Sequence, residues 1–520
     1  MILQQSKNIT RKPNGHRWSK EFIGTCLQIF NKSSNAYDTL INSKILLLPS
    51  ESTLIIYRNK IKQEPGINSE NIEWMFNEAN KQQLNEESRQ GGIVFDEMAI
   101  PCDLQIDKKG DVVELCGLVE KGEESDVCTV LRSGKTDKKL GTHVLQFLFL
   151  SVTGFRFPFA HFITDQITAS ELYSIFWKSV QLLWSFGFKI VFTCMDGAVA
   201  NRSFMHQCME KYNIANNVFK TLNPVMAGEV IFIMDFSHVM KKIRNNILKS
   251  GINQTHKKLL TLQNGQTIQW QMFIDVYNWD QQNALKLHRK LTSEHIYPDT
   301  QMKMRNHLAE QVLNEDMLYL MKQYQQHLGA KGDCLNGCIE FLEKTSEMID
   351  FFRNHREIKC LEDPQLNRIL FIAQWLFQWQ KDIQNLENET NQEKKQETHM
   401  SFQCLEDVQS CLRGVLMLCD VVLKNNPTVF VTPAIVNSDI IENVFNQQIS
   451  TYNGANNNPN SYMYKKTINS IVLGQPTISK KSNAGGHQLP STTPFTLDRS
   501  PRERRAHTDQ TTSSIKITKY

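Results

Sequence analysis

The sequence predicts an α/β protein: a mixed β-sheet with helices packed on its faces, interrupted by a large all-α insertion and preceded by a helical domain. Three observations predict this class. Apolar, β-branched runs begin just after Gly91 and Gly92, strand-like and helix-like segments alternate between residues 189 and 248, and a nearly all-helical pattern continues to Leu423. Strands that come first and later alternate with helices indicate both antiparallel and parallel strand neighbours.

The composition is typical of a soluble globular protein with several domains. The 520 residues are 40% hydrophobic and 22% charged, which is enough apolar mass for a sizeable core, and domains average about 150 residues. No run approaches the roughly 18 apolar residues of a membrane span, and the first residues lack the pattern of a secretory signal. We therefore expect a cytosolic or nuclear protein that does not enter a membrane.

Neither the cysteine spacing nor the charge distribution indicates a compact DNA-binding module. The twelve cysteines contain no CxxC pair, so we expect reduced thiols and no zinc finger. The net charge is +4, yet residues 480–520 hold eight Lys or Arg against three acids, a net of +5 that leaves −1 for the remainder. Local basic patches are compatible with these numbers.

The N-terminal region is expected to be helical after a short arm. Residues 1–17 are polar and basic and predict a flexible arm, and residues 18–85 predict a helical domain. Ser19 is the expected N-cap of a helix over 20–31. Short helices joined by a tight connection are typical of a helix-turn-helix, although many unrelated three-helix packings share this pattern.

A later helix of the same domain carries candidate DNA contacts. Pro49 marks a helix stop and Ser50 a fresh N-cap, so we expect a helix over 51–62. Arg58 and Lys60 lie on this expected helix. In a helix-turn-helix such side chains contact DNA phosphates, and both are therefore candidate DNA-binding residues.

The sheet domain is expected in two parts, separated by the helical insertion. The expected bounds are 90–250 for the first part of the core, 251–425 for the insertion, 426–475 for the C-terminal helix part of the core and 476–520 for a disordered basic tail. Within the first part we expect strands at 93–100, 104–106, 112–119, 144–163, 189–195 and 230–234, and helices at 170–187, 201–212 and up to residue 248. The turn signal at 107–110 predicts a hairpin.

Two aspartates stand where this sheet would collect a ligand. Asp96 lies in the first core strand between Phe95 and Met98, where an ionised side chain is costly unless it is paired or metal-bound. Asp196 follows a later strand, at the carboxyl end where open α/β sheets bind ligands. Neighbouring parallel strands would bring the two close enough to share Mg²⁺. An aspartate at a strand end more often caps a helix, so position alone does not decide.

Six segments resemble the P element-type DNA transposases, in order and over most of the chain. They are residues 93–100 (IVFDEMAI), 155–165 (FRFPFAHFITD), 192–204 (FTCMDGAVANRSF), 231–246 (IFIMDFSHVMKKIRNN), 304–312 (MRNHLAEQV) and 437–445 (NSDIIENVF). Their length and irregularity make chance a poor explanation. The resemblance implies a ribonuclease H-like fold that a large helical insertion interrupts.

The resemblance also implies a metal-dependent catalytic triad. The family's acids lie in the FDEM strand, at a TCDGA-like strand end and in a DxxEN helix, which here are Asp96, Asp196 and Glu442. These would hold Mg²⁺ or Mn²⁺, and two such ions stabilise the attacking and leaving oxygens of an in-line phosphodiester displacement. The implied partners are double-stranded DNA, both transposon ends and target, and further copies of the chain. The implied location is the nucleus.

A second implication is nucleotide binding. In the P element transposase the corresponding insertion binds GTP, and its D-x-x-H-x-x-K pattern corresponds to Asp235, His238 and Lys241 here. By the same alignment Asp439 would lie near the nucleotide or near the metals. GTP is therefore a candidate cofactor. The alternative is that Asp235 caps a helix and His238 is a buried, hydrogen-bonded histidine.

Lys242 and Arg244, beside Lys241, are further candidate DNA contacts.

Three hypotheses about function stay open at this stage. An active transposase is favoured by the retention of all three acids. A domesticated or truncated relative that binds DNA without cutting is favoured by the absence of cysteine from the first 25 residues, where many relatives carry a THAP zinc finger. The third is a regulatory protein that uses only a GTP-binding insertion.

Overall fold

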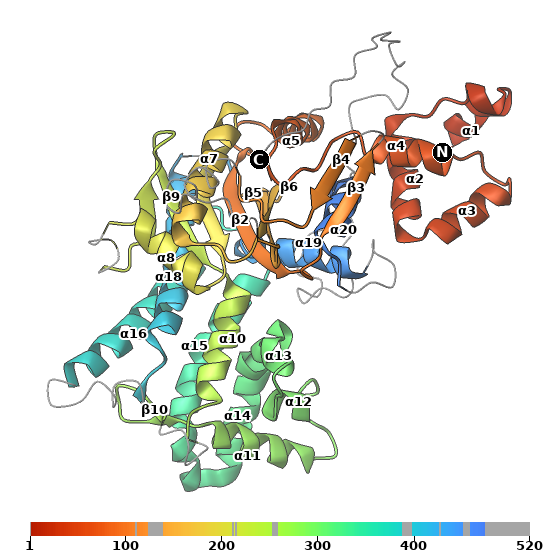
Figure 1. Cartoon of the computed structure of the whole chain (residues 1–520). Helices are drawn as coiled ribbons and strands as arrows, with labels where there is room; N and C mark the ends of the chain where they lie inside the picture. Colours follow the sequence, from red (N-terminus) through yellow and green to blue (C-terminus); the bar gives the residue numbers. More distant parts are fainter. Residues whose placement is uncertain are drawn as a thin grey trace.

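The computed structural model has two lobes, a sheet-containing lobe and an all-helical one (Figure 1). It describes residues 2–109, 112–122, 139–210, 213, 216–251, 258–386, 398–425, 428–450 and 458–473. The predicted α/β class with a mixed sheet is confirmed. The predicted tail, 476–520, lies outside the described residues. In the described part of the chain, no helix combines the length and apolarity needed to cross a membrane.

The main sheet has seven strands in the order β1-β6-β5-β2-β7-β9-β8. Only the contacts β2–β7 and β7–β9 are parallel, and the remaining neighbours are antiparallel. The strands are β1 (Gly66–Ile67), β2 (Gln90–Ala99), β5 (His143–Ser151), β6 (Arg156–Thr164), β7 (Lys189–Met195), β8 (Lys220–Leu222) and β9 (Glu229–Met234). The predicted hairpin is present as β3 (Gln105–Lys109) and β4 (Val112–Cys116), and the apolar stretch 144–163 forms two strands.

The parallel register aligns the acidic residues at one edge of the sheet. Val94 of β2 lies opposite Cys194 of β7, so Asp96 and Asp196 each follow that pair by two residues. Met195 lies opposite Met234, which places Asp235 at the equivalent position on β9. The prediction that neighbouring parallel strands carry Asp96 and Asp196 is confirmed.

Strand alternation separates the core from the acid-bearing face. Successive side chains of a strand point to opposite faces. The Phe95 ring stacks on Phe147 at 5.1 Å between centroids and also meets Phe204 of α8 (Val199–Cys208). This face is covered by α8 together with α7 (Ala169–Ser185). Asp96 therefore points to the other face, where its strand partner Gln146 accepts a hydrogen bond from Tyr464 of α20 (Ser461–Leu473).

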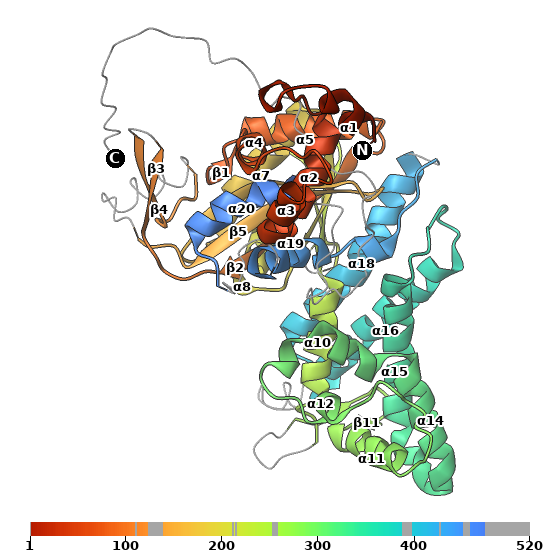
Figure 2. The same ribbon diagram turned by 90° about the vertical axis from the view of Figure 1, so that its right-hand side faces the viewer.

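The helical lobe leaves and rejoins the sheet through two helices, α10 (Phe236–Ile247) and α18 (Phe402–Asn425), as Figures 1 and 2 show. Between them lie α11 (Trp270–Gln281), α12 (Ser293–Ile296), α13 (Asn306–Leu313), α14 (Glu315–Leu328), α15 (Asn336–Arg353), α16 (Pro364–Leu386) and a small hairpin of β10 (Leu260–Thr261) and β11 (Thr267–Ile268). The predicted insertion ran to residue 425, but α18 packs on β9. Its Ser410 hydroxyl donates to the Phe232 carbonyl at 2.9 Å.

The N-terminal helices are α1 (Ile2–Ile9), α2 (Lys20–Lys32), α3 (Ser34–Asn42), α4 (Glu51–Arg58) and α5 (Ser69–Lys81). The prediction of a flexible arm over 1–17 is wrong for most of its length, because buried Asn8 exchanges two hydrogen bonds with the backbone of Arg17 and thereby anchors α1. The predicted caps Ser19 and Ser50 are confirmed. The helix expected over 51–62 ends at Arg58.

Candidate active site

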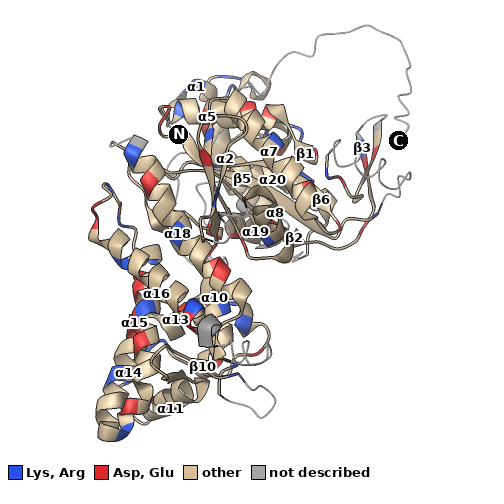
Figure 3. Ribbon diagram, turned by 90° about the vertical axis from the view of Figure 1, so that its left-hand side faces the viewer, with Lys and Arg blue, Asp and Glu red and all other residues tan. Residues whose placement is uncertain are grey.

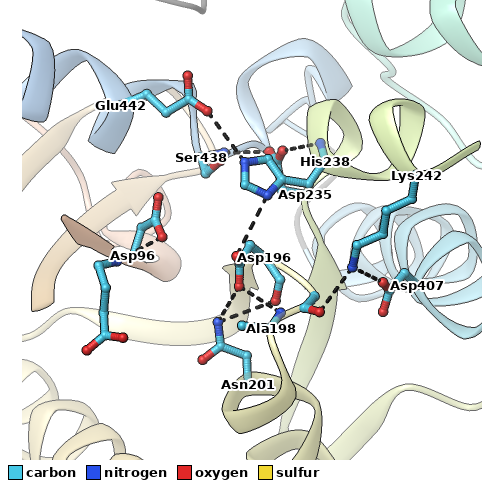
Figure 4. A network of polar contacts seen from close by, with 12 residues as sticks. Asp96, Asp196, Ala198, Asn201, Asp235, His238, Lys242, Asp407, Ser438 and Glu442 are labelled. Atoms are coloured by element: carbon cyan, nitrogen blue, oxygen red, sulfur yellow. Dashed lines mark hydrogen bonds and ion pairs between the residues drawn. The ribbon is translucent and has the colours of Figure 1, made fainter. Parts of the chain in front are cut away.

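Asp196 is held at the carboxyl end of β7 by the turn that follows it (Figure 4). Its Oδ1 accepts hydrogen bonds from the backbone N–H of Ala198 at 2.9 Å and from the amide of Asn201 at 2.6 Å. These two donors fix one carboxylate oxygen and leave Oδ2 facing His238, at 3.8 Å from its Nδ1. The turn therefore presents one aspartate oxygen to the acid-bearing face.

Asp96 lies beside Asp196 on the neighbouring strand, and its ionisation is disfavoured. Burial raises the pKa of Asp96 to about 7, and the charges of Asp196 and Glu442 also raise it, whereas His238 lowers it. Its Oδ1 accepts one hydrogen bond, from the Glu97 backbone N–H at 2.8 Å. A carboxyl group whose pKa is raised by neighbouring carboxylates is short of positive charge, and a cation beside it would relieve this.

Glu442 approaches the two aspartates from α19 (Asp439–Ser450). Its Oε1 lies 3.5 Å from His238 Nε2 and accepts a 3.5 Å hydrogen bond from Asn306. Its Oε2 is buried and has no hydrogen-bond partner among the described residues. A buried carboxylate oxygen without a partner is costly, so this atom is suited to a ligand that the polypeptide does not provide.

His238 lies between Asp196 and Glu442 and joins them (Figure 4). Burial lowers the pKa of His238, but the opposing effect of Glu442 and Asp235 is larger, so the pKa of His238 is raised above its ordinary value. The imidazolium form supplies positive charge where the carboxylates converge. The sequence had placed His238 near a nucleotide or in a buried hydrogen-bonded position. Its place among the acids was not predicted, because it depends on how α10 and α19 pack.

The donor chemistry fits a divalent cation, but the ligands are not assembled. Three carboxylates, one with an unpartnered oxygen, are the hard ligands that Mg²⁺ prefers. Nevertheless, within the described ranges no group of three or more His, Cys, Asp or Glu side chains is arranged to hold a metal ion. The His238 ring lies between Asp196 and Glu442. The assignment of Asp96, Asp196 and Glu442 as metal ligands stays a prediction.

A charged cluster secures the turn after Asp196. The Gly197 carbonyl accepts hydrogen bonds from Arg202 at 2.5 Å and from Lys242 at 3.0 Å. Both cations also bind the carboxylate of Asp407, whose side chain is only 1% exposed. Lys242, a predicted DNA contact, is thus ion-paired within the protein. Asp407 was missed in the sequence because it lies on α18, more than 200 residues after the turn that it secures.

The two aspartates predicted to bind nucleotide are instead buried in the protein. Asp235 caps α10 by accepting from the His238 backbone N–H at 2.9 Å, and it accepts from the Ser438 N–H at 2.8 Å. This is the helix-cap alternative for Asp235. Asp439 is fully buried and ion-paired with Arg353 at 3.2 Å. Lys241 is half-buried on α10.

Among the remaining predictions of DNA contacts, the one for Arg244 is wrong. This arginine is fully buried and donates to the Lys303 carbonyl at 2.9 Å and to the Asn245 side chain at 2.8 Å, so DNA phosphates cannot reach it. Arg58, the last residue of α4, and Lys60, two residues beyond it, are both half-buried.

Comparison with known proteins agrees with this architecture. Residues 63–209 match the family model described as TNP-like, RNase H N-terminal domain, and residues 237–362 match the one described as TNP-like, GTP-binding insertion domain. The fold is similar to that of the Drosophila P element transposase strand transfer complex, with a TM-score of 0.69, 15% identity, and coverage of 91% of this chain and 96% of that chain. No curated protein sequence matched.

A sheet of this kind, with acids at its strand ends and a helical insertion, defines the ribonuclease H-like class. Within that class, the pair of TNP-like domains and the shared fold identify the chain as a P element-type transposase-like protein. The resemblance predicted from the six sequence segments is therefore confirmed.

Proposed function

We propose that the protein is a DNA transposase that cleaves and joins DNA strands with Mg²⁺ or Mn²⁺ held by Asp96, Asp196 and Glu442. The observation that carries this proposal is the convergence of these acids, from β2, β7 and α19, around His238. Bound divalent ions would supply Lewis-acid stabilisation of the attacking and leaving oxygens in phosphodiester displacement.

The residues of the chain have defined tasks in this proposal. Arg202, Lys242 and Asp407 keep the Gly197 turn in place and so orient Asp196. The unpartnered Oε2 of Glu442 is available for a ligand. His238 balances the acids electrostatically when no other cation is present.

The partners follow from the same proposal. Double-stranded DNA, as transposon end and as target, is the substrate, and the P element transposase has been solved as a strand transfer complex. We infer that the protein works in the nucleus and as a homo-oligomer. The match of residues 237–362 to a GTP-binding insertion domain supports GTP as a further ligand.

A second function is favoured by one observation. Because no ready-made group of metal ligands exists within the residues described, and His238 joins Asp196 to Glu442, the chain is also suited to bind DNA without cutting it. A domesticated relative would have this property.

A cleavage assay separates the two functions. Linear duplex carrying the ends of the element that encodes the chain is incubated with Mg²⁺ or Mn²⁺, using wild type, Asp196→Asn and, as a matched control, Asp316→Asn at an exposed position on α14. We expect metal-dependent cleavage that Asp196→Asn abolishes and Asp316→Asn leaves intact. Cleavage by Asp196→Asn would refute the assigned chemistry, and DNA binding without any cleavage would favour the second function.

A further inference from the structure

Arg353 lies where the helical insertion meets the helix that carries Glu442. It is the last residue of α15 and its side chain is only 10% exposed. Its guanidinium contacts three other helices, through Glu310 on α13, Ser237 on α10 and Asp439 on α19. One insertion residue thus connects α10, α13 and α19.

The geometry around Arg353 uses both sides of the guanidinium. Nε and Nη2 donate to the two oxygens of Glu310 at 3.0 and 2.5 Å, a bidentate pair. Nη1 donates to Asp439 Oδ2 at 3.2 Å, and Nη2 donates to Ser237 Oγ at 2.7 Å. The planar, rigid fork of arginine is needed for contacts in so many directions, and the group is held tightly in one orientation.

Asp439 transmits this contact to Glu442. It is the first residue of α19 and fully buried, and Glu442 follows three residues later on the same helix. Three residues correspond to about 4.5 Å along a helix axis and nearly one turn, so a shift of the helix start moves Glu442 with it. Asn306, one turn before Glu310 on α13, also donates to Glu442 Oε1.

We propose that Arg353 is a positioning residue through which the insertion fixes α19, and with it Glu442, for metal binding. This inference rests on the proposed function of Glu442. Buried ion pairs contribute little net stability after desolvation, so stability alone does not account for a buried arginine shared between two acids on separate helices. Asp439 is accordingly a partner of Arg353, and the insertion controls the cutting site through this pair.

The test compares Arg353→Lys and Asp439→Asn with the control Glu343→Gln, which removes a partly exposed ion pair elsewhere on α15. Arg353→Lys keeps the charge and loses the fork, whereas Asp439→Asn keeps the shape and loses the charge. We expect DNA cleavage to fall about tenfold or more in both, since small misplacements of catalytic groups have effects of that order. Mn²⁺ binding to the DNA-free protein, followed by electron paramagnetic resonance, should weaken at least threefold.

Hydrogen–deuterium exchange supplies a readout that does not depend on catalysis. Exchange of α19 amides should accelerate in both variants, while α16 stays as in wild type and Glu343→Gln changes neither. Unchanged α19 exchange and unchanged Mn²⁺ affinity would overturn the inference. If wild type binds no Mn²⁺ and cuts no DNA, the proposed function fails, and so does the metal role of Arg353. In that case the exchange data still decide whether Arg353 holds α19.

Discussion

Gly197 shows how one residue sets the geometry of the candidate site. A Cβ at this position would lie 2.1 Å from Lys242 Nζ and 2.3 Å from Asp407 Oδ2, because both side chains close over the turn. We predict that Gly197→Ala lowers DNA cleavage by at least about tenfold and destabilises the fold by about 1–3 kcal/mol. Cleavage rates and urea denaturation measure the two effects. The control is Gly15→Ala, where the nearest atom outside the chain neighbours is 3.7 Å away.

His161 of β6 gives a pH-dependent prediction. Burial lowers the pKa of His161 to about 4, helped by Lys465, and the buried Nε2 has no hydrogen-bond partner among the described residues. A histidine whose folded pKa is depressed stabilises fully above its unfolded pKa of about 6.5, and this stability is lost as pH falls toward 4. The free energy of unfolding should therefore fall by up to about 3 kcal/mol over that range.

His161→Leu is the variant that isolates this effect. Its unfolding free energy should vary less between pH 6.5 and 4 than that of wild type, as measured by urea denaturation at each pH. An equal slope in both proteins would show that other groups carry the acid sensitivity.

At the scale of single residues, the sequence predicts the positions of side chains that lie in or directly after a recognisable strand. Asp196 could be found because it ends a recognisable apolar run, and Asp96 because it interrupts one on an expected neighbouring strand. The interposed His238 and the buried Asp407 could not, since their positions depend on contacts between segments far apart in the chain. Arg244 illustrates the same limit: its charge suggested DNA, and its burial beneath the Lys303 segment was invisible.

At the scale of elements, α18 is the helix whose role differs most from the prediction. Its helical pattern was correctly predicted, but periodicity does not tell which surface a helix covers. The helix lies on β9 so closely that a Cβ on Gly414 would be 2.9 Å from the Phe232 carbonyl oxygen and 2.9 Å from Ile233 Cγ1. Ser410, one turn earlier, donates to the same carbonyl. The boundary between insertion and core therefore falls within the chain segment that was assigned wholly to the insertion.

Because α18 packs so closely on β9, we expect a glycine-to-alanine substitution in this helix to have the opposite effect on stability from the usual one. Replacing glycine by alanine within a helix ordinarily stabilises it by about 1 kcal/mol. Gly414→Ala should instead destabilise the protein by about 1–3 kcal/mol, because the methyl group has to push α18 away from β9. Urea denaturation measures the change, with the exposed Gln403→Ala on the same helix as the control. Stabilisation by Gly414→Ala would show that α18 is held less closely than described.

At the scale of the whole molecule, the net charge is unevenly divided along the chain. In Figure 3 both acidic and basic residues occur along α14 and α15. The chain carries +4 in total, of which residues 480–520 contribute +5, leaving −1 for the rest. Under the proposed function, we therefore expect long-range attraction to DNA to depend mainly on the Lys and Arg of residues 480–520.

The salt dependence of DNA binding tests this division. Each phosphate that a protein neutralises lowers the slope of log Kobs against log salt by about 0.9. Replacing the eight Lys and Arg of residues 480–520 by Gln, which keeps the chain length, should make the slope for random-sequence duplex shallower by several such steps and weaken binding at low salt. The thermal stability of both proteins is measured in parallel, so that a loss of folding is not mistaken for a loss of phosphate contacts. An unchanged slope would instead place the phosphate contacts on the folded lobes. The next positions to substitute would be half-buried Lys241, Arg58 at the end of α4, and Lys60 just beyond it.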